Sequence, residues 1–144
     1  MLISKEALDA KPVDPLRDYY KDRSLRVLVV DDSWQVCLVL RKQLYRMGHL
    51  ALSVTTEEEA SRIMATRSLD LVISDLILGG EQSGLHVLDR AKILCPNASR
   101  VLMSAFVSED EMIYNQRSDI FNACFRKPWN QESLQSAIRV AYPT

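Results

Sequence analysis

The order of apolar and polar positions predicts alternating strands and helices from residue 24 onward. Short apolar runs predict five strands, at residues 25–30, 49–54, 69–74, 100–104 and 120–125. Apolar residues spaced three and four apart predict helices at 33–47, after Thr56, at 83–94, after a capping box at 108–111, and after Asn130. This alternation predicts an α/β fold, with a parallel sheet covered by helices on both faces.

The first 23 residues follow a different pattern. They carry Pro12, Pro15 and many charges, with few large apolar residues. We predict that residues 1–23 form an N-terminal extension that is flexible or weakly helical, with Pro15 at the first position of a short helix. Residues 24–144 are predicted to form one folded domain.

Polar residues gather at the predicted carboxyl ends of the strands. These residues are Asp31, Asp32, Asp75, Ser104 and Lys127. Open α/β sheets bind ligands at this edge. Three carboxylates brought together there repel one another, and burial makes each one harder to ionise. Such a cluster indicates a cation site or a reaction that needs the charges.

These residue types suit phosphoryl chemistry. Asp31 and Asp32 can offer oxygen ligands to Mg²⁺, and Asp75 can act both as a ligand and as a nucleophile. Ser104 and Lys127 can neutralise a transferring phosphoryl group, whose transfer depends mainly on positioning and charge. Simpler explanations exist for single residues. An Asp before a helix is often an N-cap, and we expect Asp31 or Asp32 to cap the first helix.

Charge and cysteine content exclude several other classes of function. There are 18 Lys and Arg against 19 Asp and Glu, so no broad basic surface for direct nucleic acid contact is predicted. No apolar run approaches the roughly 20 residues that cross a membrane. Cys37, Cys95 and Cys124 form no zinc motif and are predicted to be buried free thiols. The predicted location is the cytoplasm.

Four short motifs resemble the receiver domain of two-component response regulators. They are Val29-Val30-Asp31-Asp32, Leu71-Val72-Ile73-Ser74-Asp75-Leu76, Val101-Leu102-Met103-Ser104-Ala105 and Phe125-Arg126-Lys127-Pro128. Each motif alone is weak evidence for the family, but all four occur in the family's order and on the matching predicted strands. The resemblance covers residues 24–142. It implies a doubly wound, flavodoxin-like sheet with strand order 2-1-3-4-5, and a cis peptide bond before Pro128.

The resemblance also implies roles for the residues at the strand ends. Asp75 would accept phosphate from a histidine kinase or a phosphotransfer protein. Asp31 and Asp32 would hold Mg²⁺, with Asp75 and the Ile77 carbonyl as further ligands. Ser104 and Lys127 would contact the phosphoryl oxygens.

The chain departs from the receiver pattern at two places. Cys124 occupies the position where the family usually has Phe or Tyr, and Phe125 should point to the opposite face of the sheet. The loop at 76–84 has Gly79 and Gly80 where the family commonly has a Pro, and it is one residue longer than the family's loop. We expect these glycines to allow positive φ angles and a close approach of the backbone.

The predicted function is that of a phosphoacceptor switch, which catalyses only its own phosphorylation and dephosphorylation. Its output would be a downstream protein partner, an effector domain absent from this chain, or homodimer formation. The changing face would be strand four, helix four and strand five. One alternative is a degenerate receiver that binds partners without phosphorylation, which Cys124 favours. Another is a Mg²⁺-dependent phosphohydrolase, although Asp31-Asp32-Ser33-Trp34 lacks the Asp-x-Asp order common in that class.

Overall fold

The structure is a computed structural model that describes residues 24–105 and 119–142. Its strands are β1 (Arg26–Val30), β2 (Leu50–Val54), β3 (Leu71–Asp75), β4 (Ser99–Ser104) and β5 (Ala123–Arg126). Its helices are α3 (Trp34–Arg46), α4 (Glu57–Thr66), α5 (Gly84–Leu94) and α7 (Gln131–Ala141). The five strands pair in parallel in the order β2-β1-β3-β4-β5, so the predicted fold class and strand order are confirmed.

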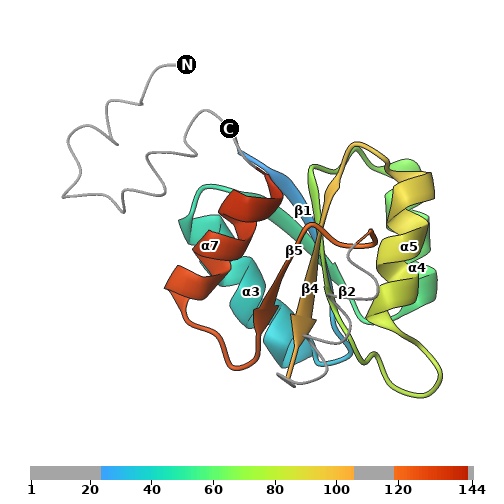
Figure 1. The fold of residues 1–144 in the computed structure, drawn as a ribbon, viewed down its shortest axis with the longest axis horizontal. Coiled ribbons are helices and arrows are strands. Elements are labelled where there is room, and N and C mark those ends of the chain that lie inside the picture. Colours follow the sequence, from blue (N-terminus) through green and yellow to red (C-terminus); the bar gives the residue numbers. More distant parts are fainter. Residues whose placement is uncertain (1–23, 106–118, 143–144) are drawn as a thin grey trace.

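The helices form two layers on either side of the sheet. Figure 1 shows α3 and α7 on one face, and α4 and α5 on the other. Successive residues of a strand point to opposite faces, so Val27 and Val29 join one apolar cluster, and Leu28 and Val30 join the other. A strand buried on both faces in this way reads as a continuous apolar run in the sequence.

Side chains cap the helices at the residues before them. Thr56 accepts a hydrogen bond from the Glu59 N–H, and Asn130 accepts one from the Ser133 N–H, so both predicted caps are confirmed. The N-cap of α3 is Ser33, whose hydroxyl accepts from the Val36 N–H. The prediction that Asp31 or Asp32 caps this helix is therefore wrong.

The amino end of β1 is tied to the turn before β2. The Leu25 N–H donates a hydrogen bond of 3.1 Å to Nδ1 of His49, whose side chain is buried. Gly48, which follows α3, has a φ of 95°. This left-handed conformation favours glycine, in line with the predicted end of the helix.

Strand β5 begins at Ala123, three residues later than the sequence pattern predicts. Ile120 and Phe121 are buried, which explains the apolar pattern, but they precede the ladder. The Asn122 side chain accepts from the Arg100 N–H at 2.7 Å, while the Asn122 N–H donates to the Arg100 carbonyl. A side-chain oxygen thus replaces the backbone acceptor, and regular pairing starts only after it.

Some predictions lie outside the described residues, namely those on the 1–23 extension and on the helix that starts near 108. The peptide bond between Lys127 and Pro128 is cis, as the resemblance implied. Among the described helices, none has the length and apolar content needed to span a membrane.

Candidate functional site

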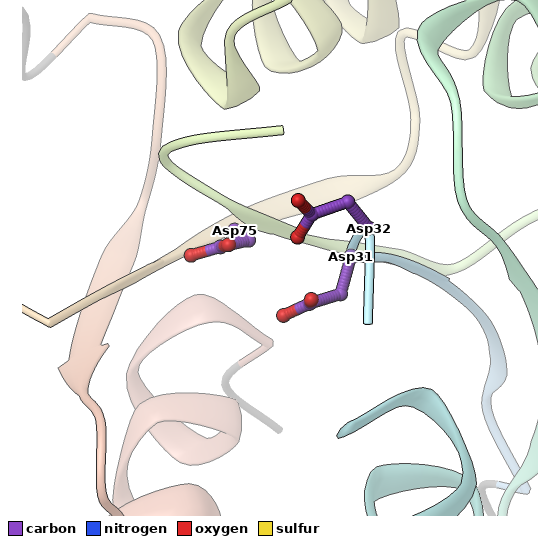
Figure 2. Close-up of side chains that lie close together, drawn as sticks. All are labelled: Asp31, Asp32 and Asp75. Atoms are coloured by element: carbon purple, nitrogen blue, oxygen red, sulfur yellow. The ribbon is translucent and has the colours of Figure 1, made fainter. Parts of the chain in front are cut away.

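Three aspartates meet beyond the carboxyl ends of β1 and β3. One carboxylate oxygen from each of Asp31, Asp32 and Asp75 lies within 4.8 Å of the others. Figure 2 shows the Asp31 and Asp32 side chains directed toward the side where Asp75 lies. Asp31 is fully buried, Asp75 is 8% exposed and Asp32 is exposed, so the cluster opens to solvent on one side. Adjacent parallel strands bring the carboxylates together, as the sequence predicted.

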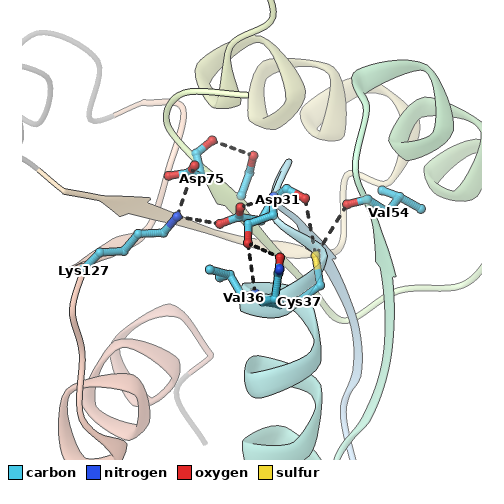
Figure 3. Close-up of polar contacts among 9 residues, drawn as sticks. Asp31, Val36, Cys37, Val54, Asp75 and Lys127 are labelled. Atoms are coloured by element: carbon cyan, nitrogen blue, oxygen red, sulfur yellow. Dashed lines mark hydrogen bonds and ion pairs between the residues drawn. The ribbon is translucent and has the colours of Figure 1, made fainter. Parts of the chain in front are cut away.

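Lys127 joins two of these carboxylates (Figure 3). Its Nζ lies 2.6 Å from Oδ2 of Asp31 and 3.2 Å from Oδ2 of Asp75. Lys127 directly follows β5, which lies two strands away from β3. One ammonium faces three carboxylates, so the cluster keeps negative charge that a divalent cation could neutralise.

The charges of the cluster alter its acid–base properties. Burial raises the pKa of Asp75, the charge of Asp31 raises it further, and Lys127 opposes both effects. Burial would lower the pKa of Lys127, but its hydrogen bond to Asp31 and the charges of Asp31 and Asp75 outweigh burial and raise it. The ammonium therefore stays protonated, while Asp75 holds its proton more readily than an exposed Asp does.

Residues at the start of α3 hold Asp31 in place. Oδ1 of Asp31 accepts a hydrogen bond of 2.8 Å from the Ser33 N–H. The Cys37 thiol approaches the Asp31 carbonyl at 3.4 Å and the Val54 carbonyl at 3.9 Å (Figure 3). Burial and the charge of Asp31 raise the pKa of Cys37, so this buried thiol stays protonated and acts as a donor. Ser33 and Cys37 were missed because their contacts depend on the turn into α3.

Glycines shape the loop after Asp75. Gly79 and Gly80 have φ angles of 87° and 58°, in agreement with the expectation from sequence. A Cβ added at Gly79 would lie 3.4 Å from Oδ2 of Asp32, which indicates a close approach to the cluster. Gly84 starts α5, and a Cβ there would lie 1.8 Å from the Asp75 carbonyl oxygen. A glycine at the first position of a helix is a sequence signal for such contact, because glycine is a poor helix former.

The loop is also bonded to α4. The Gln82 side chain accepts a hydrogen bond of 2.8 Å from the Glu57 N–H, at the first turn of that helix. Nearby, Nδ1 of His86 lies 2.5 Å from Oε1 of Glu57. The first contact joins the loop to α4 and the second joins α5 to α4, and the sequence periodicity gives no sign of either.

The remaining predicted site residues lie at the same edge. Ser104 ends β4, is buried, and its carbonyl accepts from the Lys127 N–H at 2.8 Å. Ile77 lies two residues beyond Asp75 and pairs with Ser83 in an isolated bridge. Their expected contacts with a phosphoryl group and a metal remain predictions.

The family model described as the response regulator receiver domain matches residues 27–139. The chain belongs to this family. The receiver domain is similar to the sensory/regulatory protein RpfC of Xanthomonas campestris pv. campestris, with 33% identity over 95 residues. This match covers 66% of the chain but 13% of RpfC, so the receiver domain corresponds to a small part of that relative.

Solved structures show the same receiver fold. A response regulator protein from Burkholderia pseudomallei, described with a phosphorylated aspartic acid, a calcium ion and citrate, has a TM-score of 0.70 and 24% identity, over 79% of this chain and 66% of that one. A CheY-like receiver domain protein from Methanospirillum hungatei JF-1 has a TM-score of 0.71 and 21% identity, over 81% of this chain and 91% of that one. These structures agree in fold with the family match over residues 27–139, which identifies the chain as a receiver domain of two-component signalling.

The position of the usual aromatic residue carries a small side chain in this receiver domain. Cys124 is half-buried, not fully buried as predicted, and packs against the cluster beneath α4 and α5. Phe125 joins the opposite cluster and meets Trp129 edge-on at 5.8 Å. The two residues therefore point to opposite faces, as strand alternation predicted. Cys37 and Cys95 are buried free thiols, as expected.

Proposed function

We propose that this receiver domain accepts a phosphoryl group on Asp75 from the phosphohistidine of a histidine kinase or a phosphotransfer protein, in a reaction that depends on Mg²⁺. The observation that carries the proposal is the cluster of Asp31, Asp32 and Asp75, with Lys127 bridging two of the three carboxylates. A carboxylate can form an acyl phosphate, and the neighbouring groups supply charges of the kind that phosphoryl transfer needs.

In the proposed reaction, a carboxylate oxygen of Asp75 attacks the phosphorus atom of the phosphohistidine. A P–O bond forms while the P–N bond breaks, and the imidazole nitrogen leaves with the bonding electron pair. Lys127 and the Ser104 hydroxyl would contact the phosphoryl oxygens, where they offer hydrogen-bond donors to the developing charge. Water later hydrolyses the acyl phosphate, so the protein returns to its starting state without turnover of an external substrate.

The donor set fits a hard divalent cation. Mg²⁺ prefers oxygen ligands and usually takes few carboxylates, and we propose that Asp31, Asp32, Asp75 and the Ile77 carbonyl hold it. When bound, Mg²⁺ would supply positive charge to both the carboxylates and the phosphoryl oxygens. Asp31 is held in place without the cation, since its carboxylate accepts a hydrogen bond from the Ser33 backbone N–H and pairs with the Lys127 ammonium.

The proposed output is a population shift in the face formed by β4, the helix expected near 108 and β5. A phosphoryl group adds negative charge and acceptor oxygens beside Ser104 and Lys127. A downstream protein, an effector domain or a second copy of the chain would read this change. The proposed setting is the cytoplasm, where reducing conditions preserve free thiols such as Cys37 and Cys95.

Transfer from acetyl phosphate tests the proposal. With Mg²⁺, we expect the intact protein to gain the mass of one phosphoryl group, and Asp75→Asn to gain none. Asp89→Asn is the matched control, because Asp89 is exposed on α5. Removal of Mg²⁺ with a chelator should abolish the gain.

The degenerate receiver remains the second candidate, and the small side chain of Cys124 is the observation that favours it. If wild type, like Asp75→Asn, gains no phosphoryl mass with Mg²⁺ and a phosphohistidine donor, that result would support this candidate and contradict the proposal. Sustained release of phosphate from an ester substrate would instead favour a phosphohydrolase.

A further inference from the structure

A large groove lies away from the acidic cluster, along α3, β2 and the amino ends of β1 and β3. Its volume is about 790 Å³. Five cationic side chains line it, and they are Arg26, Arg41, Lys42, Arg46 and Arg67. The residues that line it include no Asp or Glu, so the groove has a strongly positive character.

Most of these cations are available to a partner. Arg26 pairs with Asp70 at 3.3 Å. Within residues 24–105 and 119–142, no ion pair involves the other four. Arg41, Arg46 and Arg67 are all exposed, so an approaching anion meets them directly.

Apolar side chains lie between the cations. Tyr45 is 73% exposed, Leu50 59%, Leu38 41% and Leu52 39%, and all four line the groove. Exposed apolar residues scattered singly are ordinary, but a contiguous group beside a groove marks an interaction surface. The groove therefore offers both burial for apolar groups and pairing for carboxylates.

The groove also includes the edge of the sheet, because β2 is the terminal strand. The Leu50 N–H donates to the Leu25 carbonyl and the Val54 carbonyl accepts from the Asp31 N–H, so the backbone groups of these residues face β1. Alternation then directs the backbone groups of Ala51 and Ser53 outward. An extended peptide can add to such an edge and place alternate side chains in neighbouring pockets.

A second copy of the chain fits this surface poorly. A twofold contact would place the same patch of both copies together. Arg41, Arg46 and Arg67 would then face a surface of the same charge, which is unfavourable.

The N-terminal segment and nucleic acid also fit less well. Residues 1–23 carry equal numbers of acidic and basic residues, which are Glu6, Asp9, Asp14, Asp18 and Asp22 against Lys5, Lys11, Arg17, Lys21 and Arg23. They bring no net negative charge to a basic groove. A nucleic acid backbone would pair with the cations but would gain little from Leu50 and Leu52.

We propose that this groove is a docking site for an extended acidic segment of a partner protein, with large apolar side chains between its carboxylates. The carboxylates would pair with Arg41, Arg46 and Arg67, and the apolar side chains would cover Leu50 and Leu52. The groove lies at the amino ends of the strands, whereas the acidic cluster lies at their carboxyl ends. Docking therefore goes beyond the phosphoacceptor function and does not require Asp75.

A fluorescent peptide of alternating Glu and Leu tests the proposal in a titration against the full chain. We expect saturable binding that weakens about tenfold in the double variant Arg41→Glu/Arg46→Glu, because each reversal replaces an attraction with a repulsion. Leu50→Thr should weaken binding several-fold while keeping a residue that favours strands. Arg139→Glu, an exposed charge reversal on α7, and Asp75→Asn should leave binding unchanged.

Control ligands separate the alternatives. A Lys–Leu peptide should not bind, and a Glu–Ser peptide and a single-stranded oligonucleotide should bind much more weakly than the Glu–Leu peptide. Equal binding of the oligonucleotide, or an equal loss in Arg139→Glu, would overturn the proposal.

Two further outcomes would assign the groove to another occupant. Binding that appears only after Leu16, Tyr19 and Tyr20 are replaced by Ser would assign it to residues 1–23. Self-association of the wild type that Arg41→Glu/Arg46→Glu abolishes would assign it to a second copy. Absence of saturable binding in wild type and in the Ser variant would also overturn the proposal.

Discussion

The two ends of the parallel strands carry opposite charge, and each end holds an ion pair that links separate segments of the sheet. At the carboxyl end, Lys127 lies 2.6 Å from Asp31, and their side chains are 21% and 1% exposed. At the amino end, Arg26 lies 3.3 Å from Asp70, and their side chains are 53% and 22% exposed. Lys127 is more buried than Arg26 and also lies 3.2 Å from Asp75, so both burial and this second contact favour a larger contribution from the carboxyl-end pair. A surface pair is screened by water, whereas a buried carboxylate depends on its partner.

Replacing the cation of each ion pair should give the largest difference in stability between the two ends. Lys127→Met leaves the buried carboxylate of Asp31 without its counter-charge, and we expect the free energy of unfolding to fall by about 3 kcal/mol. Arg26→Met should lower it by less than about 1 kcal/mol, because the pair is exposed and Asp70 keeps its bond to the Arg26 N–H. Urea denaturation measures both changes. Equal losses would contradict the role given to burial.

A fall in pH should lower the stability contributed by His49, at the amino end, and raise the stability contributed by Asp75, at the carboxyl end. Burial lowers the pKa of His49 from 6.5 to about 4, with the charge of Asp70 opposing this. As the pH falls from 6.5 toward 4, the unfolded chain binds a proton that the folded chain excludes, so His49 lowers stability by up to about 3 kcal/mol. Asp75 has a raised pKa, so its folded form binds a proton first and gains stability between that raised value and the ordinary 3.8.

The variant His49→Asn isolates the amino-end contribution, since the Asn side chain also offers an acceptor to the Leu25 N–H. We expect the difference in stability between wild type and His49→Asn to shrink as the pH falls from 6.5 to about 4. Urea denaturation over this range provides the measurement. A difference that stays constant with pH would show that His49 does not supply the acid sensitivity.

Packing at the carboxyl end can be tested with two glycines that follow Asp75, one in the loop and one at the start of α5. Gly84→Ala would force a Cβ against the Asp75 carbonyl, and we expect a loss of about 2 kcal/mol, with a lower rate of phosphorylation. Gly80→Ala has open space, so only its positive φ opposes the change, at a cost of about 1 kcal/mol. Thermal unfolding distinguishes the two, and a larger effect at Gly80 would contradict the contact described.

Bound Mg²⁺ should stabilise the carboxyl end of the sheet only, and by less than the largest effects above. At ten times its Kd, Mg²⁺ should add about 1.4 kcal/mol to the free energy of unfolding. The gain should decrease as the pH falls through the raised pKa of Asp75, because a proton then competes with the cation. Asp32→Asn should reduce the gain, and Asp70→Asn, at the amino end, should leave it unchanged. Fluorescence of Trp34, which is 63% exposed and follows Asp32 by two residues, provides a readout for the same titration.

Apolar runs that end in an acidic residue were enough to predict the sheet and the meeting of Asp31, Asp32 and Asp75. The apolar pattern predicts the strands, and the position of each aspartate at a strand's end predicts their meeting, because parallel strands bring their carboxyl ends to one edge. The presence of Lys127 at this edge also followed, through a motif after the last strand, but its ion pair with Asp31 is visible only in the folded structure. The start of β5 did not, since the Asn122 side chain takes a place in the ladder that only the folded structure reveals.

The basic groove could not be predicted from the sequence. Its cations lie at positions 26, 41, 42, 46 and 67, with no local cluster except on α3. They converge only because β1, β2 and the start of β3 place their amino ends beside that helix. The overall net charge of -1 hides this separation, since the opposite charges gather at different ends of the same sheet.

The bond between Gln82 and the Glu57 N–H has a mechanical consequence. A loop that moves away from the aspartates must break this bond, and the first turn of α4 then loses an acceptor. Deuterium uptake at the Glu57 amide would thus measure how often the loop after Asp75 moves away from the aspartates. The exchange rate of a single amide proton, 18 residues before Asp75 in the sequence, would therefore report on the opening of the loop beside the acidic cluster.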